Sequence, residues 1–526
     1  MSRVLVTEPL ADEGMALLRA QAEVDVLPAT SSSQLAGVIG PYHALVVRSK
    51  TQVTGEALAA ARSLAVVGRA GTGVDNIDLD AATRRGVVVV NAPYGNTISV
   101  AELTLGLLLA LVRHIPFADA AMRQGRWEKQ SCEGVQVRGK VLGLIGLGRV
   151  GLAVARRALG LEMKVVAYDA FVTPERAALA GVQWLPLEDL LSTADVVSLH
   201  LPDTPQTRGF IGGTELARMK PSAYLINCAR GSLVDELALT SALRSGRLAG
   251  AALDVFAAEP PPDSPLLHLD SVVLSPHLAG STAEAQRDTA VEVAQQVLDV
   301  LQGRVPRYPV NAPALSADEL EAVGPYLDLA QRLGRFYAQY KGDHLCALEV
   351  ACSGDVVLQR MDLMVGAVLV GLLSGTSEEV VNWVNAPAVA RERGIAFAAR
   401  TDPVQSTAGW SNLVEVKFGT STEQRIVAGA ILRGEPHIVR VDGFWVDFPA
   451  RGHLLVTEHV EQPGIIGRMG NILGSAAVNI SFIQVGANQR GGPGVMVLGL
   501  DDVPAPAVMA QVLKLPSIRS AKMVKL

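Results

Sequence analysis

Between residues 3 and 90, apolar residues alternate between short continuous runs and longer stretches with helical spacing. The short runs are rich in valine and predict buried strands, and the longer stretches predict helices between them. Strands that alternate with helices in this way form a parallel sheet. A long helical pattern at residues 99–113 then leads away from this unit. The strand runs lie at residues 4–7, 44–47, 65–67 and 87–91, and the helical stretches include residues 11–22 and 54–61.

The same alternation returns between residues 140 and 275. A second long helical pattern, at residues 282–302, follows it. Two long helices that bracket the second alternating unit indicate that it is inserted into the first. The strands expected in the second unit lie at residues 141–145, 164–168, 196–200, 224–227, 250–254 and 272–274.

The pattern changes after a proline-containing linker at residues 304–314. Helical stretches at residues 317–340 and 355–373 surround alternating stretches at residues 414–418 and 426–432, which predicts a separate α+β domain. Residues 453–526 then follow the order β-α-β-β-α-β, which is typical of a ferredoxin-like domain. The strands of this last unit are expected at residues 454–459, 479–485, 495–500 and 518–524, and its helices at residues 466–476 and 505–513.

A G-x-G-x-x-G motif at Gly146, Gly148 and Gly151 lies between the strand at residues 141–145 and a helical stretch at residues 150–159. The first glycine allows a tight turn, the second allows close approach of a pyrophosphate, and the third allows the helix to pack on the strand. Asp169 follows the next strand, 18 residues after Gly151. Its carboxylate can accept hydrogen bonds from both adenosine ribose hydroxyls and would repel a 2′-phosphate. The motif therefore predicts a Rossmann domain that binds NAD rather than NADP.

Arg230, Glu259 and His277 each follow an apolar strand of this second unit. Because ligands bind at the carboxyl ends of parallel strands, we expect the three side chains to face one crevice. Oxidation of a secondary alcohol needs a base for the hydroxyl proton, and a histidine suits this near neutral pH. The sequence predicts His277 as the acid/base, Glu259 as the carboxylate that holds its tautomer, and Arg230 as the anchor for a substrate carboxylate.

Composition narrows the possible partners. The 526 residues contain 46 Lys and Arg against 52 Asp and Glu, a net charge of −6, and only 4% are aromatic. Neither nucleic acid nor an anionic membrane surface is therefore an expected partner. The most apolar stretch, at residues 103–112, is too short for a membrane span. The four cysteines form no C-x-x-C pair and no metal-ligand pattern, so we expect a cytoplasmic protein without a bound metal. Residues 1–6 lead straight into a predicted strand, so no signal peptide is expected.

Residues 1–310 resemble the D-isomer-specific 2-hydroxyacid dehydrogenases, and the resemblance extends beyond the glycine motif. Further motifs carry it: His200-Leu201-Pro202 with Thr204 and Thr207, Asn227-Cys228-Ala229-Arg230-Gly231, Leu253-Asp254-Val255-Phe256 with Glu259-Pro260, and Pro276-His277.

Within this family, residues 47–49, 68–76 and 281–286 resemble the branch that oxidises 3-phospho-D-glycerate to 3-phosphooxypyruvate, the first step of phosphorylated L-serine biosynthesis. The long form of that branch has an intervening domain and a C-terminal ACT domain. The resemblance implies an α/β chain in which a Rossmann domain is inserted in a flavodoxin-like substrate domain, followed by an α+β domain and a ferredoxin-like ACT domain. The expected boundaries are 1–97 with 283–310 for the substrate domain, 98–282 for the NAD domain, 311–450 for the intervening domain and 453–526 for the ACT domain.

The resemblance also implies site residues. A phosphoglycerate carries roughly three negative charges near pH 7, which Arg230 alone cannot balance. The substrate contacts implied are Arg48, Ser49, Arg69, Gly71 and Asn96. The NAD contacts implied are Thr72, Gly146, Gly148, Arg149, Val150, Gly151, Asp169, Leu201, Cys228, Ala229, Arg230, Asp254, His277, Ala279 and Gly280.

At the C-terminus, the resemblance implies a homodimer or homotetramer in which L-serine binds at an interface between ACT domains. His459, Glu461 and Asn479 stand at the positions expected for that site. Glu461 departs from the family pattern because aspartate is usual there. An alternative that the ACT domain mainly assembles subunits stays open.

Two other functions are also compatible with the sequence. One is a dehydrogenase or reductase for another 2-hydroxy acid such as 2-hydroxyglutarate, and Arg48, Arg69 and the two extra domains argue against it. The other is a non-catalytic NAD(H)-sensing regulator with the same dehydrogenase fold. The ACT domain and the acidic net charge argue against that reading.

Overall fold

The computed structural model describes residues 2–28, 31–261, 263–304, 306–313, 317–342, 344–354, 360–375, 381–401, 410, 412–489 and 491–526. The chain divides into two compact units. The first consists of Met1–Val53, Gly68–Ile77 and Val90–Asp299, and the second of Thr54–Val67, Asp78–Val89 and Val300–Leu526. The four domain boundaries expected from the sequence remain a prediction.

The N-terminal part of the chain forms a five-stranded sheet in the order β2-β1-β3-β4-β5, the flavodoxin-like order. The valine-rich strands were predicted, but β2 was not, because it is a half-exposed edge strand with no continuous apolar run. The elements are β1 (Arg3–Val6), α1 (Asp12–Gln21), β2 (Glu23–Val26), α2 (Ser32–Val38), β3 (Ala44–Val47), α3 (Gly55–Ala60), β4 (Val66–Arg69), α4 (Leu79–Arg84) and β5 (Val88–Asn91).

The second sheet has seven strands in the order β12-β11-β10-β9-β6-β7-β8, and every pair of neighbours is parallel. This confirms the predicted Rossmann order. The direction of strand order reverses between β6 and β9, and ligands bind at such a switch point in open α/β sheets. The strands are β6 (Val141–Ile145), β7 (Lys164–Tyr168), β8 (Gln183–Trp184), β9 (Val196–Leu199), β10 (Tyr224–Asn227), β11 (Gly250–Leu253) and β12 (Val272–Leu274).

Helices of this region precede, connect and follow the seven strands. The α6 helix was not predicted; it begins after a left-handed His114 and carries a proline in its first turn. In the part of the chain that the structure describes, no single helix could span a membrane, although α5 and α6, bent by 64°, pass by length and composition as a pair. The helices are α5 (Thr97–Val112), α6 (Ile115–Arg123), η1 (Lys129–Cys132), α7 (Arg149–Gly160), α8 (Pro174–Ala178), α9 (Leu187–Thr193), α10 (Gly213–Arg218), η2 (Gly231–Leu233), α11 (Glu236–Arg244), η3 (Pro265–His268) and α12 (Ala283–Leu301).

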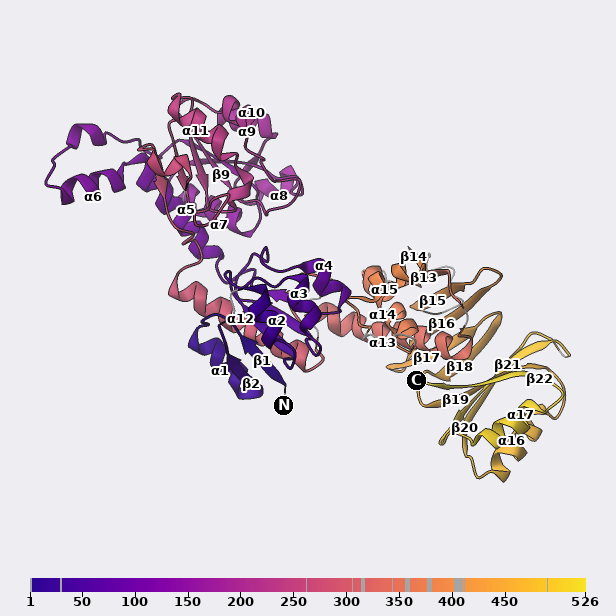
Figure 1. Ribbon diagram of the computed structural model, residues 1–526. Coiled ribbons are helices and arrows are strands. Elements are labelled where there is room, and N and C mark those ends of the chain that lie inside the picture. Colours follow the sequence, from indigo (N-terminus) through magenta and orange to yellow (C-terminus); the bar gives the residue numbers. More distant parts are fainter. Residues whose placement is uncertain are drawn as a thin grey trace. The chain divides into compact units, whose positions relative to one another are not determined.

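The second unit contains a mixed six-stranded sheet in the order β14-β13-β15-β16-β17-β18, in which only β13 and β14 are parallel. Figure 1 shows α13, α14 and α15 gathered on one side of this sheet. The predicted helix at residues 355–373 is observed from Met361 onward, and residues 355–359 lie outside the described residues. The elements are α13 (Ala317–Tyr340), β13 (Ala347–Ser353), α14 (Met361–Leu373), α15 (Ala386–Glu392), β14 (Ala396–Thr401), β15 (Leu413–Gly419), β16 (Gln424–Leu432), β17 (Glu435–Val441) and β18 (Phe444–Pro449).

The C-terminal elements form an antiparallel four-stranded sheet in the order β20-β21-β19-β22. The predicted β-α-β-β-α-β succession is confirmed. Apolar residues of the two helices, such as Met469 and Val512, cover one face of the sheet. The elements are β19 (His453–Val460), α16 (Ile465–Ser475), β20 (Ile480–Ala487), β21 (Pro493–Leu500), α17 (Pro506–Leu513) and β22 (Ile518–Lys525).

The opposite face of this C-terminal sheet packs into the core of the six-stranded sheet. Val456 and Val497 belong to the same buried cluster as Phe336 and Phe448. Phe448 links the two parts, since its ring centroid lies 6.2 Å from that of Phe336 on α13 and 6.3 Å from that of Phe482 on β20. The regions predicted as separate intervening and ACT domains therefore share one hydrophobic core.

The shared core makes a prediction for Phe448→Ala. Removal of this buried ring should destabilise the unit by about 3–5 kcal/mol, because a cavity opens between α13, β18 and β20. Hydrogen–deuterium exchange should then quicken in β19 and β20 as well as in β17 and β18. Faster exchange confined to residues 413–449 would contradict the shared core.

Candidate active site

The glycine motif forms the turn from β6 into α7. Gly146 has a φ of 101°, and a Cβ there would lie 2.5 Å from the carbonyl oxygen of His200. A Cβ on Gly151 would lie 2.3 Å from the carbonyl oxygen of Gly146. Gly148, the N-cap of α7, has no neighbouring atom within 4 Å of its Cβ position. The first and third glycines therefore shape the turn, and the second leaves the helix start open to a pyrophosphate.

Asp169, the first residue after β7, is bonded to the glycine loop. One carboxylate oxygen accepts the Leu147 N–H at 2.8 Å, and the other accepts the Phe171 N–H at 2.8 Å. Each oxygen retains a further acceptor site, so the arrangement fits a ribose beside the loop. Arg149, another expected NAD contact, donates to the Pro93 carbonyl at 2.8 Å, and its guanidinium lies 4.5 Å from the centroid of the Tyr94 ring.

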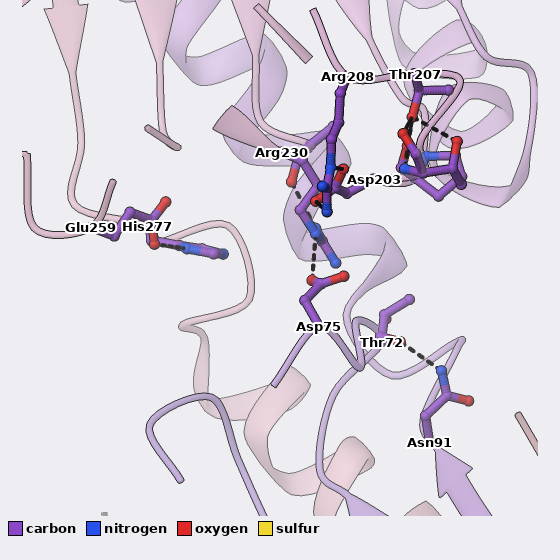
Figure 2. A network of polar contacts seen from close by, with 12 residues as sticks. Thr72, Asp75, Asn91, Asp203, Thr207, Arg208, Arg230, Glu259 and His277 are labelled. Atoms are coloured by element: carbon purple, nitrogen blue, oxygen red, sulfur yellow. Dashed lines mark hydrogen bonds and ion pairs between the residues drawn. The ribbon is translucent and has the colours of Figure 1, made fainter. Parts of the chain in front are cut away.

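His277 and Glu259 form a pair, with Nδ1 of the imidazole 2.7 Å from Oε2 of the carboxylate. Oε1 of Glu259 accepts the backbone N–H of Phe256 at 3.1 Å, so the carboxylate is held on its far side as well. The acceptor on Nδ1 favours the tautomer in which Nδ1 carries the proton and Nε2 is free to accept one. Figure 2 shows the two side chains together, with the imidazole ring extending beyond Glu259.

Asp254 organises the loop that carries His277. Its buried carboxylate accepts the N–H groups of Leu278 and Ala279 at 2.7 and 2.9 Å and the Ser275 hydroxyl at 2.6 Å. Its carbonyl accepts the N–H of His277 at 2.8 Å. His277 has a φ of 53°, which a non-glycine residue adopts only when its surroundings impose it. Asp254, predicted as an NAD contact, is thus placed where it fixes the histidine.

Arg230 is bonded to a residue that the sequence reasoning missed. Its Nε donates to Oδ2 of Asp75 at 2.8 Å, and NH1 donates to the Ala229 carbonyl at 2.7 Å. A Cβ on Gly73 would lie 2.0 Å from NH2, so glycine lets the guanidinium lie directly against the backbone here. Figure 2 shows Arg230 and Asp75 pointing toward one another, with Arg208 beside them. The only sequence signal for Asp75 was its place in the motif at residues 68–76.

Arg69 is half-buried next to this pair. Burial, and then the positive charges of Arg230 and Arg48, lower the pKa of Arg69 to about 10. Its Nε is buried without a hydrogen-bond partner among the described residues. Gly71, with a φ of 149°, lies directly beneath it, because a Cβ there would be 1.6 Å from NH1 of Arg69. The guanidinium groups of Arg48, Arg69 and Arg230 are thus close enough for their positive charges to interact. Such a cluster of charges fits a ligand with several negative charges.

The remaining predicted substrate and NAD contacts, and His200 of the His200-Leu201-Pro202 motif, lie in different surroundings. The hydroxyl of Thr72 donates to the side-chain oxygen of Asn96 at 2.7 Å, so these two residues lie together.

Cys228 is buried, and burial raises the pKa of its thiol to about 12, which leaves it a neutral packing residue. Burial lowers the pKa of His200 to about 4, so it is a poor candidate for proton transfer near neutral pH. Ser49 is exposed, Ala279 is buried, and Val150, Leu201, Ala229 and Gly280 are half-buried.

The residues expected to bind a regulator fall into two places. Nε2 of His459 lies 3.0 Å from Oε2 of Glu461. Asn479 donates instead to Asp501 at 2.7 Å. In the sheet, His459 on β19 lies opposite Gly494 on β21, and Gly494 lies opposite Ala487 at the end of β20. Asn479 comes just before the other end of β20. Asn479 and Ala487 are eight residues apart, and at about 3.3 Å per residue the separation along the strand is roughly 26 Å. One chain therefore does not join all three residues in one site.

The NAD-binding region matches a known family: residues 105–279 match the D-isomer specific 2-hydroxyacid dehydrogenase NAD binding domain. The crystal structure of the TT0316 protein from Thermus thermophilus is similar to this chain. The two align over 59% of this chain and 99% of the TT0316 chain, with 38% sequence identity and a TM-score of 0.55. The fold and the NAD-binding site thus place the protein in the class of NAD-dependent 2-hydroxyacid dehydrogenases.

Full-length relatives narrow the assignment. D-3-phosphoglycerate dehydrogenase of Archaeoglobus fulgidus is 40% identical over the full length of both chains. The enzyme of the same name from Synechocystis is 42% identical over all of this chain and 95% of its own. Residues 322–442 match the D-3-phosphoglycerate dehydrogenase intervening domain. The chain belongs to the D-3-phosphoglycerate dehydrogenase family.

Asp169→Ala tests the reading of the nucleotide ribose. Loss of the carboxylate should lower the ratio of kcat/KM for NAD to kcat/KM for NADP by about tenfold, because a charge-assisted hydrogen bond is lost and repulsion of a 2′-phosphate ends. Asp169→Asn is the matched control for the bond to Leu147, since it retains one acceptor oxygen. An unchanged ratio in both variants would mean that another residue reads the ribose.

Proposed function

We propose that this chain oxidises 3-phospho-D-glycerate to 3-phosphooxypyruvate with NAD, the first step of phosphorylated L-serine biosynthesis. The observation that carries the proposal is the His277–Glu259 pair, with Nδ1 and Oε2 2.7 Å apart, in a chain of this family. Such a pair suits proton transfer and gives no advantage to a regulator that only senses NAD(H). The cytoplasmic location and the four-domain division remain predictions.

Bound NAD would accept the hydride from C2 of the substrate. The chain's own residues manage the proton, which passes from the C2 hydroxyl to Nε2 of His277. Glu259 holds the proton on Nδ1 and stabilises the imidazolium that forms. Phe256, through its N–H, keeps Glu259 in place during this charge change.

The guanidinium groups bind and orient the substrate. Arg230 faces the carboxylate and polarises the oxygen at C2, and Asp75 and the Ala229 carbonyl set the plane of its guanidinium. Arg48, Arg69 and Ser49 hold the phosphate, with Gly71 and Asn96 shaping the loops beside it. Two or three positive charges on these side chains balance the roughly three negative charges of the substrate.

Steady-state kinetics of two variants test these roles. His277→Ala should lower kcat for phosphoglycerate by about 10²–10⁴-fold with a small change in KM. Arg48→Ala should raise KM by about tenfold with kcat largely retained, because it removes an ionic contact made equally in the ground and transition states. The wild-type chain should prefer phosphoglycerate to 2-hydroxyglutarate. The reverse pattern of effects would overturn the assignments.

We also propose that the chain works as a homodimer or homotetramer that serine inhibits. Apolar side chains on and near α6 are exposed, with Trp127 79% accessible, and a second copy of the chain would cover them. The ACT residues favour the same conclusion, because His459 and Asn479 could share a ligand only if they came from two copies.

Serine titration of the full chain tests this proposal. Serine should lower the rate of the wild-type enzyme, and Asn479→Ala should abolish the inhibition without changing the rate in the absence of serine. Asn488→Ala, an exposed asparagine after β20, is the matched control and should remain inhibited. A monomeric molar mass by light scattering, or a rate that serine does not change, would contradict the proposal.

A further inference from the structure

The loop at residues 48–51, which follows β3 and carries Arg48 and Ser49, is wrapped around a buried carboxylate. Oε1 of Glu8 accepts three backbone N–H groups of this loop, from Arg48 at 2.9 Å, Lys50 at 3.1 Å and Thr51 at 2.9 Å. Glu8 is only 8% exposed. Successive N–H groups that converge on one point form a concave anion site. In this loop, the anion at that point is a side chain of the protein itself.

Asn76 holds the same loop from its carbonyl side. Its side-chain amide donates to the carbonyl oxygens of Arg48 at 2.8 Å and Thr51 at 2.7 Å. The hydroxyls of Thr7 and Thr51 are bonded to each other at 2.8 Å in the interior. The backbone of residues 48–51 is therefore fixed on both sides, whereas the side chains of Ser49 and Lys50 are exposed.

This arrangement decides how the loop can bind a phosphate. Because Glu8 occupies the N–H groups of Arg48, Lys50 and Thr51, those groups do not donate to the ligand. Apart from the N–H of Ser49, which Glu8 does not accept, the loop contributes side chains, and these project from a backbone whose shape Glu8 sets. Arg48 itself donates to the carbonyl of Pro9, the residue after Glu8, at 3.3 Å. Glu8 also acts on Arg69 by its negative charge, which opposes the lowering of the Arg69 pKa.

We propose that Glu8 is a positioning residue for the phosphate subsite: its carboxylate organises the loop so that Arg48, Ser49 and Lys50 present their side chains to the substrate phosphate. This inference rests on the proposed function and adds Lys50 to the phosphate contacts. Glu8 touches neither substrate nor cofactor, and it acts through the loop. The carboxylate end of the substrate, bound by Arg230, does not depend on it.

Glu8→Gln is the direct test in the full-length enzyme. Gln keeps one acceptor oxygen for the three loop N–H groups but loses the negative charge that strengthens those bonds. Its NH₂ group replaces the second oxygen, which lies 3.3 Å from the backbone nitrogen of Lys50. The loop should therefore be held less firmly. KM for 3-phosphoglycerate should rise by about tenfold, with kcat within about twofold. The Kd of NADH and the inhibition constant of tartronate, a phosphate-free 2-hydroxy dicarboxylate, should stay at their wild-type values.

Three further variants make the result decisive. Glu13→Gln makes the same charge change on the exposed first turn of α1 and should alter nothing. Glu8→Asp, which restores the charge, should recover part of the loss in KM. Asn76→Ser removes the two bonds on the other side of the loop and should raise KM in the same way, which keeps a test available if Glu8→Gln fails to fold.

The outcomes separate this inference from the proposed function. An unchanged KM in Glu8→Gln or Asn76→Ser would overturn it, as would a loss of kcat and of tartronate inhibition in parallel with the rise in KM, since that pattern marks a general structural role. If the wild-type enzyme turns over phosphoglycerate and Arg48→Ala raises KM but Glu8→Gln does not, only this inference fails. If the wild-type enzyme does not turn over phosphoglycerate, the proposed function fails first.

Discussion

Carboxylates at the exits of parallel strands, each bonded to the backbone N–H groups of a loop, are the interaction on which the site depends. Asp254 after β11 holds the His277 loop, Glu8 near the end of β1 holds the Arg48 loop, and Asp169 after β7 holds the glycine loop. Burying a charge is costly unless hydrogen bonds satisfy it. Each loop must therefore keep the shape that supplies those bonds, and a strand end is thereby converted into a rigid platform for a functional side chain.

The cationic side of the site obeys a related constraint. Guanidinium groups that gather at one site repel each other. The pKa of Arg69 is lowered first by its burial and then by the positive charges of Arg230 and Arg48. Asp75, bonded to Arg230, supplies a compensating negative charge within the same loop that contains Gly71 and Gly73. Those glycines leave room for the two arginine side chains to lie against the backbone. Charge, backbone freedom and side-chain orientation are thus set together by residues 69–76.

The sequence pattern predicted the parts of the structure that depend on local periodicity. Buried strands such as β3, β6 and β10 have continuous apolar runs, and the order of strands and helices predicted the Rossmann and ACT topologies. Edge strands such as β2 and β14 escaped prediction because their exposed positions carry polar or small residues. The contacts of Glu8 and Asp75 were not predicted, because their partners lie 40 and 155 residues away in the sequence. The local pattern of residues does not indicate a contact across such a separation.

The C-terminal unit shows how a strand can serve two surfaces at once. Adjacent residues of β19 face opposite sides of the sheet. Glu458 accepts hydrogen bonds from Tyr340 at the end of α13 and from Ser520 on β22, both at 2.9 Å, and is paired with Lys341. The next residue is His459, which is bonded to Glu461. The pairing of β19 with β22 shifts register between Glu458 and His459. Glu458 and His459 are neighbours on one strand, so the same backbone segment carries both the ion pair with Lys341 and the bond to Glu461, above a core that is shared with α13.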